Sequence, residues 1–343
     1  MRILVTGHTG FKGSWLCLML KKLGHDVYGI GLNPPKNGLF ELASVKTVCS
    51  TDVRLDIRNK EALDAEVDRV QPEIVLHLAA QALVLTSYEQ IYETYSTNVV
   101  GTLNVLDSSL KSEHLKGIIV VTSDKVYEQR KKEFFVETDI LGGKDPYSSS
   151  KALADKLTQD WSMQNKSISV GIARAGNVIG GGDVSSNRLI PDIFAAVQEN
   201  RPPIIRNPNS VRPWQHVLDC LNGYVKLMDF VASGNSGIFN FGPAAGELYS
   251  VRDVMNYMSK VLGIKNWELL TANEDKEAEH LAINSAKAFS TLKWENKLTF
   301  HRSLDLTLEW YFPFSNLESK RDLSMRQIDN FLETFNAVDG TGQ

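Results

Sequence analysis

Hydrophobic and polar positions along the first half of the chain predict short strands separated by helices. Apolar runs rich in β-branched residues occupy positions 2–6, 27–32, 74–78, 118–122 and 169–175. Runs of this length are typical of strands that are buried on both faces of a parallel sheet. Residues 14–23 repeat apolar side chains at helical spacing. The chain is therefore predicted to have an α/β fold with a Rossmann-type, doubly wound parallel sheet.

The pattern changes after Asn177, which predicts two interleaved domains. Residues 1–177 carry the strand–helix repeat, and segments near 211–242 return to this part. Residues 178–335 form mainly a smaller, C-terminal α/β domain that is rich in loops. We also expect one long helix over residues 88–110 in the first domain.

A glycine-rich turn lies between the first strand and the first helix. Gly7, Gly10 and Gly13 are spaced G-x-x-G-x-x-G, with Thr9 and Phe11 between them. Glycines at such a corner let the backbone approach a pyrophosphate, whose charge is stabilised by the helix N-terminus. The position of this turn at the start of a strand–helix–strand unit predicts a dinucleotide-binding site.

The preferred dinucleotide depends on the residue that contacts the adenine ribose, about 20 residues after the glycines. Asn33 occupies this place. An asparagine can hydrogen-bond a ribose hydroxyl but does not repel a 2′-phosphate, and Lys12 and Lys36 lie nearby in the sequence. We expect NAD as the cofactor, with NADP as the alternative.

Other residues at predicted strand ends suit a bound ligand. Residues 78–81, Leu-Ala-Ala-Gln, follow a strand, and their small side chains let a cofactor lie against the backbone. Asp56 and Ile57 follow another short apolar segment, where Asp56 either meets the ligand or caps the next helix. Asn98 lies inside the predicted long helix, where a buried asparagine needs a hydrogen-bond partner.

The strand at 118–122 turns polar within one residue. Thr122, Ser123, Asp124 and Lys125 follow it at the edge of the sheet where ligands bind in open α/β folds. This stretch predicts either a catalytic site or a surface turn with an ion pair between Asp124 and Lys125.

Tyr147 and Lys151 lie four residues apart at the start of a predicted helix, and therefore share one face. A lysine ammonium beside a tyrosine hydroxyl favours the phenolate and lowers the tyrosine pKa from about 10. The pair is predicted to act as a general base near neutral pH.

Composition narrows the choice of partners. The 343 residues are 43% hydrophobic and carry a net charge of −4, with no long basic run, which argues against a nucleic-acid partner. No stretch approaches 18 apolar residues, so no membrane span is expected. The three scattered cysteines suit reduced thiols in the cytoplasm, and none has the spacing of metal ligands.

Together these motifs resemble the CDP-glucose 4,6-dehydratase family, within the extended short-chain dehydrogenase/reductase superfamily. The similarity spans nearly the whole chain and lies in residues 7–16, 78–81, 122–127, 145–151, 173–183, 188–192 and 212–217. The Ser-Asp-Lys triplet at 123–125 is the discriminating feature. Other sugar-nucleotide 4,6-dehydratases carry Asp-Glu at the last two positions, and epimerases carry neither pair.

The resemblance implies that the protein removes water from a CDP-hexose, by internal hydride transfer through NAD, to give a 4-keto-6-deoxy sugar. It implies that Tyr147 and Lys151 form the redox base pair and that Ser123 hydrogen-bonds the C4 oxygen. Asp124 is then the acid for water loss, which requires a raised pKa. Lys125 is the base at C5, which requires a neutral amine. A simple ion pair between these two side chains would oppose both states.

The resemblance also assigns binding residues. Those for the cofactor are Gly7, Thr9, Gly10, Phe11, Gly13, Asn33, Asp56, Ile57, Leu78, Ala79, Ala80, Tyr147 and Lys151. Those for the nucleotide sugar, which the smaller domain is expected to help bind, are Gln81, Asn98, Asn177, Arg188, Arg212 and His216. The arginines suit a pyrophosphate because of their bidentate fork. The alternative for Arg188 and Arg212 is that they are arginines of the protein surface. The alternative for His216 is that it has a structural role.

Alternatives to this function stay open. Residues 82–88 lack the proline and arginines common in the family, which bears on the sugar specificity. An NDP-sugar 4-epimerase or reductase needs only Ser123, Tyr147 and Lys151, and a non-catalytic nucleotide-binding module needs none of them. The resemblance further implies a cytoplasmic homodimer that pairs through helices 88–110 and 147–162, acting in deoxysugar biosynthesis such as that of lipopolysaccharide O-antigen.

Overall fold

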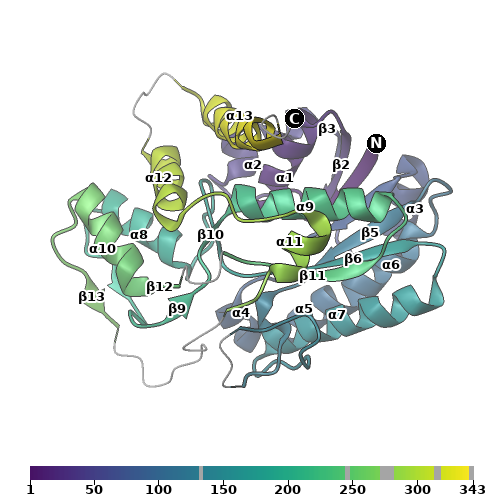
Figure 1. Ribbon diagram of the computed structural model, residues 1–343, viewed down its shortest axis with the longest axis horizontal. Coiled ribbons are helices and arrows are strands. Elements are labelled where there is room, and N and C mark those ends of the chain that lie inside the picture. Colours follow the sequence, from purple (N-terminus) through teal and green to yellow (C-terminus); the bar gives the residue numbers. More distant parts are fainter. Residues whose placement is uncertain (131–133, 244–247, 271–281, 313–317, 340–343) are drawn as a thin grey trace.

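The structure is a computed structural model that describes residues 1–130, 134–243, 248–270, 282–312 and 318–339. A central parallel sheet of seven strands has the order β11-β6-β5-β4-β1-β2-β3 (Figure 1). The predicted doubly wound fold is confirmed. The strands are β1 (Arg2–Thr6), β2 (Asp26–Gly31), β3 (Cys49–Arg54), β4 (Ile74–His77), β5 (Gly117–Val121), β6 (Ser169–Ala175) and β11 (Gly237–Phe241).

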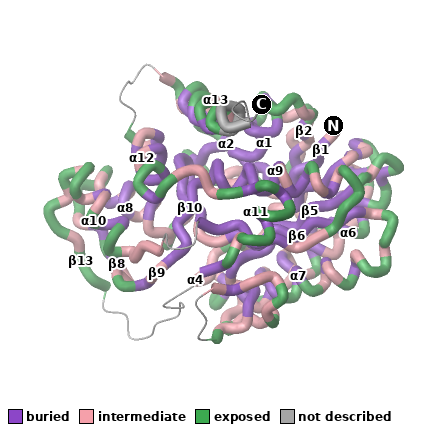
Figure 2. Tube along the Cα trace, viewed as in Figure 1, coloured by how far each residue is buried: buried purple, intermediate pink, exposed green. Residues whose placement is uncertain are grey.

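Helices cover both faces of the sheet because alternate strand residues point to opposite sides. One face, with Ile3, Val5 and Ile119, packs under helices α1, α9, α11 and α13. The other face, with Leu4 and Ile118, packs on α3, α6 and α7. The strands and the inner faces of these helices are the buried part of the molecule (Figure 2). The bounds are α1 Phe11–Lys22, α2 Leu39–Leu42, α3 Lys60–Val70, α6 Thr102–Ser109, α7 Pro146–Gln164, α9 Val217–Ala232, α11 Ala286–Leu292 and α13 Lys320–Asp339.

The predicted helix over 88–110 is wrong in its details. The segment begins earlier, with α4 (Val84–Glu89), breaks at Gln90, and resumes as α5 (Ile91–Tyr95). It then widens into a π-helix over Ser96–Gly101 before α6. The wider turn carries Asn98, whose carboxamide points inward to the end of β4 and to α7.

A smaller lobe lies beside the carboxyl ends of the strands (Figure 1). Its own core joins α8, α10 and α12 through Phe194, Met255 and Leu304. Short strand pairs complete it, namely β7 with β10, β8 with β13 and β9 with β12. The bounds are α8 Leu189–Gln198, α10 Val251–Leu262, α12 Phe300–Tyr311, β7 Val178–Ile179, β8 Ile204–Ile205, β9 Val211–Arg212, β10 Gln215–His216, β12 Tyr249–Ser250 and β13 Glu268–Leu269.

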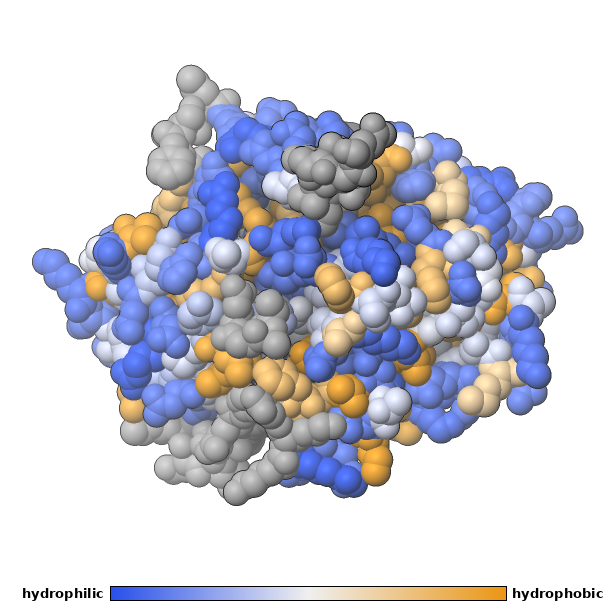
Figure 3. Space-filling model, viewed as in Figure 1, coloured by the Kyte–Doolittle hydropathy of each residue, from blue (hydrophilic) through white to orange (hydrophobic). Residues whose placement is uncertain are grey.

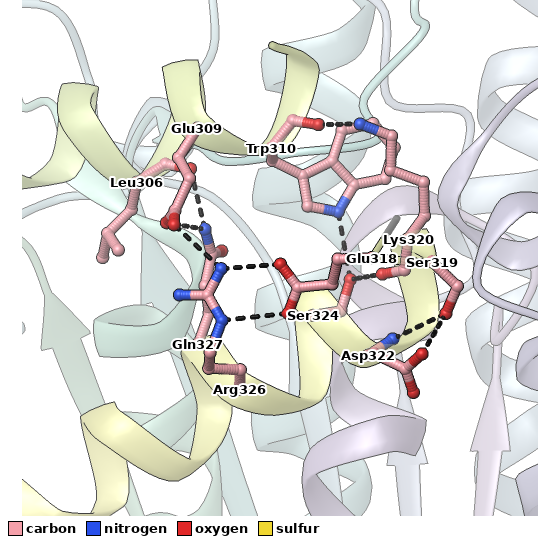
Figure 4. Close-up of polar contacts among 10 residues, drawn as sticks. All are labelled: Leu306, Glu309, Trp310, Glu318, Ser319, Lys320, Asp322, Ser324, Arg326 and Gln327. Carbon is pink, nitrogen blue, oxygen red and sulfur yellow. Dashed lines mark hydrogen bonds and ion pairs between the residues drawn. The ribbon is translucent and has the colours of Figure 1, made fainter. Parts of the chain in front are cut away.

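The last helix, α13, connects the two parts. It packs on α12 of the smaller lobe and on α1 and α2 of the larger one. On α12, the indole N–H of Trp310 donates to the Ser324 hydroxyl over 3.0 Å, and Arg326 binds Glu309 at 2.9 Å (Figure 4). Leu323 and Phe331 enter the core cluster that also contains α1. The outer surface in this view is mostly hydrophilic, with hydrophobic residues scattered over it (Figure 3).

Candidate active site

One cavity of about 980 Å³ runs from the glycine turn, past the carboxyl ends of the central strands, into the smaller lobe. Its position is the edge at which open α/β sheets bind ligands. Nineteen of the twenty-two residues predicted for catalysis or binding line it, and the exceptions are Gln81, Asn98 and His216.

The glycine turn packs its backbone closely against neighbouring backbone at the edge of the cavity. Gly7 has φ +76°, and a Cβ there would lie 2.7 Å from the Ala79 nitrogen. A Cβ on Gly13 would lie 2.1 Å from the Gly7 carbonyl oxygen. Gly10 caps α1 without a side-chain hydrogen bond, so the first N–H groups of the helix face the cavity, together with Thr9 and Phe11. This end of the cavity suits a pyrophosphate.

The next part of the lining follows β2 and β3. Asn33 is exposed and lines the cavity, whereas Lys36 does not. Asp56 does not cap α3, because Asn59 is the capping residue. Instead the Asp56 carboxylate is bound by Arg58, whose other arm donates to Glu93 over 2.5 Å. The capping alternative for Asp56 is therefore wrong.

Gln81 and Asn98 lie behind the cavity and organise its wall. Asn98 accepts the Gln81 N–H over 2.8 Å and donates to the Ser150 hydroxyl over 2.9 Å. The Gln81 side chain is occupied by the Leu83 backbone and Thr94. These amides connect the end of β4 to α7, so they support the site from behind. Leu78, Ala79 and Ala80, by contrast, line the cavity.

The five predicted catalytic residues meet at the centre of the cavity. Tyr147 lies in the first turn of α7, which is capped by Asp145, and its N–H donates to Ser87 over 3.1 Å. Its hydroxyl is hydrogen-bonded to Ser123. The Lys151 ammonium, one turn further along α7, donates to the carbonyl oxygen of Val121 over 3.1 Å.

Burial controls the charges in this centre. It raises the pKa of Tyr147, against our expectation of a lowered value, and the interaction with the Ser123 hydroxyl offsets only part of this effect. The same burial, with the ammonium of Lys12 nearby, lowers the pKa of Lys151 to about 8. The expectation failed because the sequence pair shows which groups are neighbours but not how far they are removed from water.

Asp124 is a buried carboxyl group with an unused oxygen. Its Oδ1 accepts from the Ser123 hydroxyl over 3.1 Å, and its Oδ2 has no partner among the described residues. Burial raises its pKa more strongly than Lys125 lowers it. Both residues lie in the described part of the chain and form no ion pair there, so the surface-turn alternative is wrong. A protonated Asp124 can donate to a ligand.

The smaller lobe supplies the polar residues opposite the catalytic centre. Asn177, Arg188 and Arg212 line the cavity, and Arg188 is held by the Asp183 carboxylate at 3.1 Å. His216 is instead buried beneath the lining, where its Nδ1 accepts the Leu218 N–H over 3.3 Å at the start of α9. Burial lowers its pKa to about 3, so the structural alternative for this histidine is the one the structure shows.

Several lining residues were not predicted. Lys12 follows Phe11 in the glycine turn, but its amine points to the Tyr224 hydroxyl at 3.4 Å, away from Asn33. Asp192 and Arg206 line the far end of the cavity. Asp192 lies inside the apolar segment 189–197, and Arg206 directly follows the apolar segment 202–205; a charged residue at such a place is the signal that the sequence offered.

Two other kinds of site are absent from the described part of the chain. Among the residues that the structure describes, no group of three His, Cys, Asp or Glu side chains could hold a metal ion. Within those same ranges, the helices are too short or too polar to cross a membrane.

Comparisons with known proteins agree with this geometry. The model of the NAD dependent epimerase/dehydratase family matches residues 3–242. The chain is 37% identical to a CDP-glucose 4,6-dehydratase of Salmonella typhimurium, over 96% of each chain. A dTDP-glucose 4,6-dehydratase of Bacillus anthracis, solved with NAD, superposes with a TM-score of 0.76 at 26% identity, covering 91% of this chain and 96% of that one. A UDP-glucose 4-epimerase of Thermotoga maritima shares the fold, with a TM-score of 0.81 at 23% identity over 91% and 98%.

Proposed function

The chain belongs to the NAD dependent epimerase/dehydratase family, and from this premise we propose that it converts CDP-glucose to CDP-4-keto-6-deoxyglucose with loss of water. The observation that carries the proposal is Asp124. Its carboxyl is buried beside Tyr147 and Ser123, has a raised pKa and keeps one oxygen unused. A dehydratase needs such an acid to expel water, whereas an epimerase does not.

NAD fits the cavity as the cofactor. The close approach of Gly7 and Gly13 and the open N-terminus of α1 would hold its pyrophosphate, and Asn33 its adenine ribose. The lining offers no uncommitted cation beside Asn33, since Arg58 is engaged by Asp56 and Glu93. This supports NAD over NADP, whose extra phosphate needs a positive partner. When bound, NAD would supply reversible hydride chemistry at the sugar.

The residues divide the proton transfers among themselves. Tyr147 Oη takes the proton from the sugar O4 as a phenolate, a form that burial opposes and that the positive charges of bound NAD and of Lys151 would favour. The Ser123 hydroxyl orients the O4 oxygen. The resulting 4-ketone acidifies the C5 hydrogen, and the Lys125 amine removes it as a proton. Asp124 protonates the C6 hydroxyl, which leaves as water. Lys125 then returns its proton to C5, and the proton that Tyr147 took from O4 passes back to Asp124, so the balance is the loss of one water molecule. Arg188 and Arg212 would bind the diphosphate.

A second function is supported by a specific observation. A 4-epimerase requires only Ser123, Tyr147 and Lys151, and all three meet in the cavity. It would leave Asp124 and Lys125 without a chemical role. A non-catalytic module is disfavoured because it has no use for a tyrosine, a serine and a lysine gathered at the centre of a ligand cavity.

The direct test is product formation. Purified protein is incubated with CDP-glucose, with and without added NAD, and the 4-keto product is followed by its absorbance in alkali. We expect product from CDP-glucose, and no product from any NDP-hexose would overturn the dehydratase. Release of a C4 epimer instead would establish the second function.

A variant tests the assignment of the C5 base. Lys125→Ala should still oxidise C4 but should stop there, because the C5 proton cannot leave. Reduced cofactor should therefore accumulate and absorb near 340 nm. Lys125→Arg is the matched control for the loss of charge, and it should stop at the same point because a guanidinium is not a base. Full turnover by Lys125→Ala would remove Lys125 from the mechanism.

We further propose that the protein is a cytoplasmic homodimer. Apolar side chains are exposed on α5 and the π-helix, namely Ile91, Tyr92 and Val100, and on α7 at Leu153. Tyr92 alone is 84% exposed, which is costly for a large aromatic side chain unless a partner covers it. The cysteines of the described part are free, as in a reducing compartment. A role in making deoxysugars, including those of lipopolysaccharide O-antigen, stays a prediction.

A further inference from the structure

The far end of the cavity is the part that the reaction does not use. If the sugar meets Tyr147 and the diphosphate meets Arg188 and Arg212, the nucleobase must extend beyond them into the smaller lobe. That end is lined by Asp192, Ile204, Ile205, Arg206, Asn207 and Leu270. Apolar walls with a few charged groups are suited to a flat ring that has polar atoms at its edge.

Two charged side chains face each other at this end. Asp192 lies in the first turn of α8, and Arg206 directly follows β8. Their closest atoms, Asp192 Oδ2 and Arg206 Nη2, are 3.6 Å apart. This separation is longer than a hydrogen bond, so neither group fully satisfies the other. The Asp192 carboxylate accepts one backbone hydrogen bond from Asn187, and burial still raises its pKa more strongly than this bond and Arg206 lower it, so a further donor would stabilise the carboxylate.

A carboxylate beside a guanidinium offers an acceptor next to donors. Cytosine presents the complement, because its 4-amino group donates while N3 and O2 accept. Uracil and thymine present a carbonyl at position 4 and an N–H at position 3. If uracil or thymine lay against Asp192 and Arg206, its position-4 carbonyl would face the Asp192 carboxylate. Its position-3 N–H would face the Arg206 guanidinium. Both contacts are repulsive, and such repulsion is an effective source of specificity.

We propose that Asp192 and Arg206 select cytosine, with the Asp192 carboxylate accepting from the 4-amino group and Arg206 donating to N3 or O2. This inference rests on the proposed function for the direction in which the substrate lies. It goes beyond that function by assigning the choice of nucleotide to two residues that take no part in the chemistry.

The test measures binding without turnover. The Kd values of CDP, UDP and dTDP are determined by calorimetry on the whole chain. We expect wild type to prefer CDP over UDP by at least about tenfold, since one good bidentate base contact discriminates by this order. Asp192→Asn keeps the size but can donate to a carbonyl. It should bind CDP about tenfold more weakly, bind UDP more tightly, and so lose or invert the preference.

Two controls make the result specific. Glu199→Gln removes a carboxylate at the other end of α8, outside the cavity, and should leave the ratio of Kd values unchanged. A CDP analogue that lacks the 4-amino group serves as the second probe. It should bind wild type about tenfold more weakly than CDP, which tests the contact even if Asp192→Asn fails to fold.

The possible results separate the inference from the proposed function. An unchanged CDP-to-UDP ratio in Asp192→Asn, or equal binding of CDP and its analogue by wild type, would overturn the assignment of Asp192. The dehydratase could still turn over CDP-glucose in that case. Conversely, a wild type that prefers CDP but makes no 4-keto product would overturn the proposed reaction and would support the base selection.

Discussion

Lys151 shows how the site sets charge at the scale of single residues. Its ammonium is almost fully buried, has one carbonyl acceptor at Val121, and lies near the ammonium of Lys12. The folded pKa of about 8 lies below its ordinary value of 10.5. Folding therefore releases a proton between these two pH values. Below pH 8 the charged lysine costs the fold its full penalty, and the penalty disappears as pH rises through 10.5.

We predict that Lys151→Met abolishes turnover but stabilises the fold at neutral pH. Removing a buried charge should raise the free energy of unfolding at pH 7 by on the order of 2 kcal/mol. The gain over wild type should shrink when the melting temperatures are compared at pH 7, 8.5 and 10. Lys156→Met, on the exposed side of α7, should show no such pH-dependent gain. If Lys151→Met exceeded wild type in stability by the same amount at all three pH values, the buried charge of Lys151 would not be the cause.

The same scale explains which site residues could be predicted. Motif positions such as Gly7, Ser123 and Tyr147 follow from chemistry that tolerates few other residue types. His216 and Gln81 are polar residues at strand ends, and nothing in the sequence tells which side of the cavity wall they face. Asp192 was not predicted, because a charged residue inside an apolar helix is usually interpreted as a solvent-exposed position.

At the scale of elements, the strands and glycine turn were predictable and the helix before β5 was not. The break at Gln90 and the π-helix over Ser96–Gly101 leave the hydrophobic period almost unchanged, so periodicity cannot reveal them. Their reason is tertiary, because the wider turn lets Asn98 reach Gln81 and Ser150.

One loop between elements allows a strong prediction. Gly181 lies against Trp310 of α12, and a Cβ there would fall 1.9 Å from the ring. Its carbonyl oxygen also accepts from the Trp15 indole over 2.9 Å. Gly181→Ala should therefore lower the free energy of unfolding by about 3 kcal/mol, because neither tryptophan can move.

Urea unfolding measures this loss. Gly142→Ala is the matched control, since its added Cβ would meet no atom closer than 3.4 Å. It should stay within about 0.5 kcal/mol of wild type. Equal stability of the two variants would show that the loop at Gly181 adapts freely.

At the scale of the whole molecule, α13 holds the two lobes together. Phe331 is buried in the core cluster that contains α1. It lies about 10 Å further along the helix than Ser324, which contacts α12. We predict that Phe331→Ala costs about 3–5 kcal/mol, although the side chain is remote from the cavity lining. Thermal unfolding should show one lowered transition, and not two, because both lobes share this helix.

The control for this prediction is Phe289→Ala, which removes the same ring from an exposed place on α11. It should change stability by less than about 0.5 kcal/mol. A separate early transition of the smaller lobe in Phe331→Ala would contradict the coupling.

The position of α13 also sets the order in which the protein can be made. Its apolar face completes a core that includes residues of β1 and α1, which are synthesised long before α13. The ribosome must therefore release α13 before that core can close. Until then the nascent chain presents the uncovered side of α1, which is the kind of surface that chaperones bind. A premature stop before α13 would leave this exposure permanent.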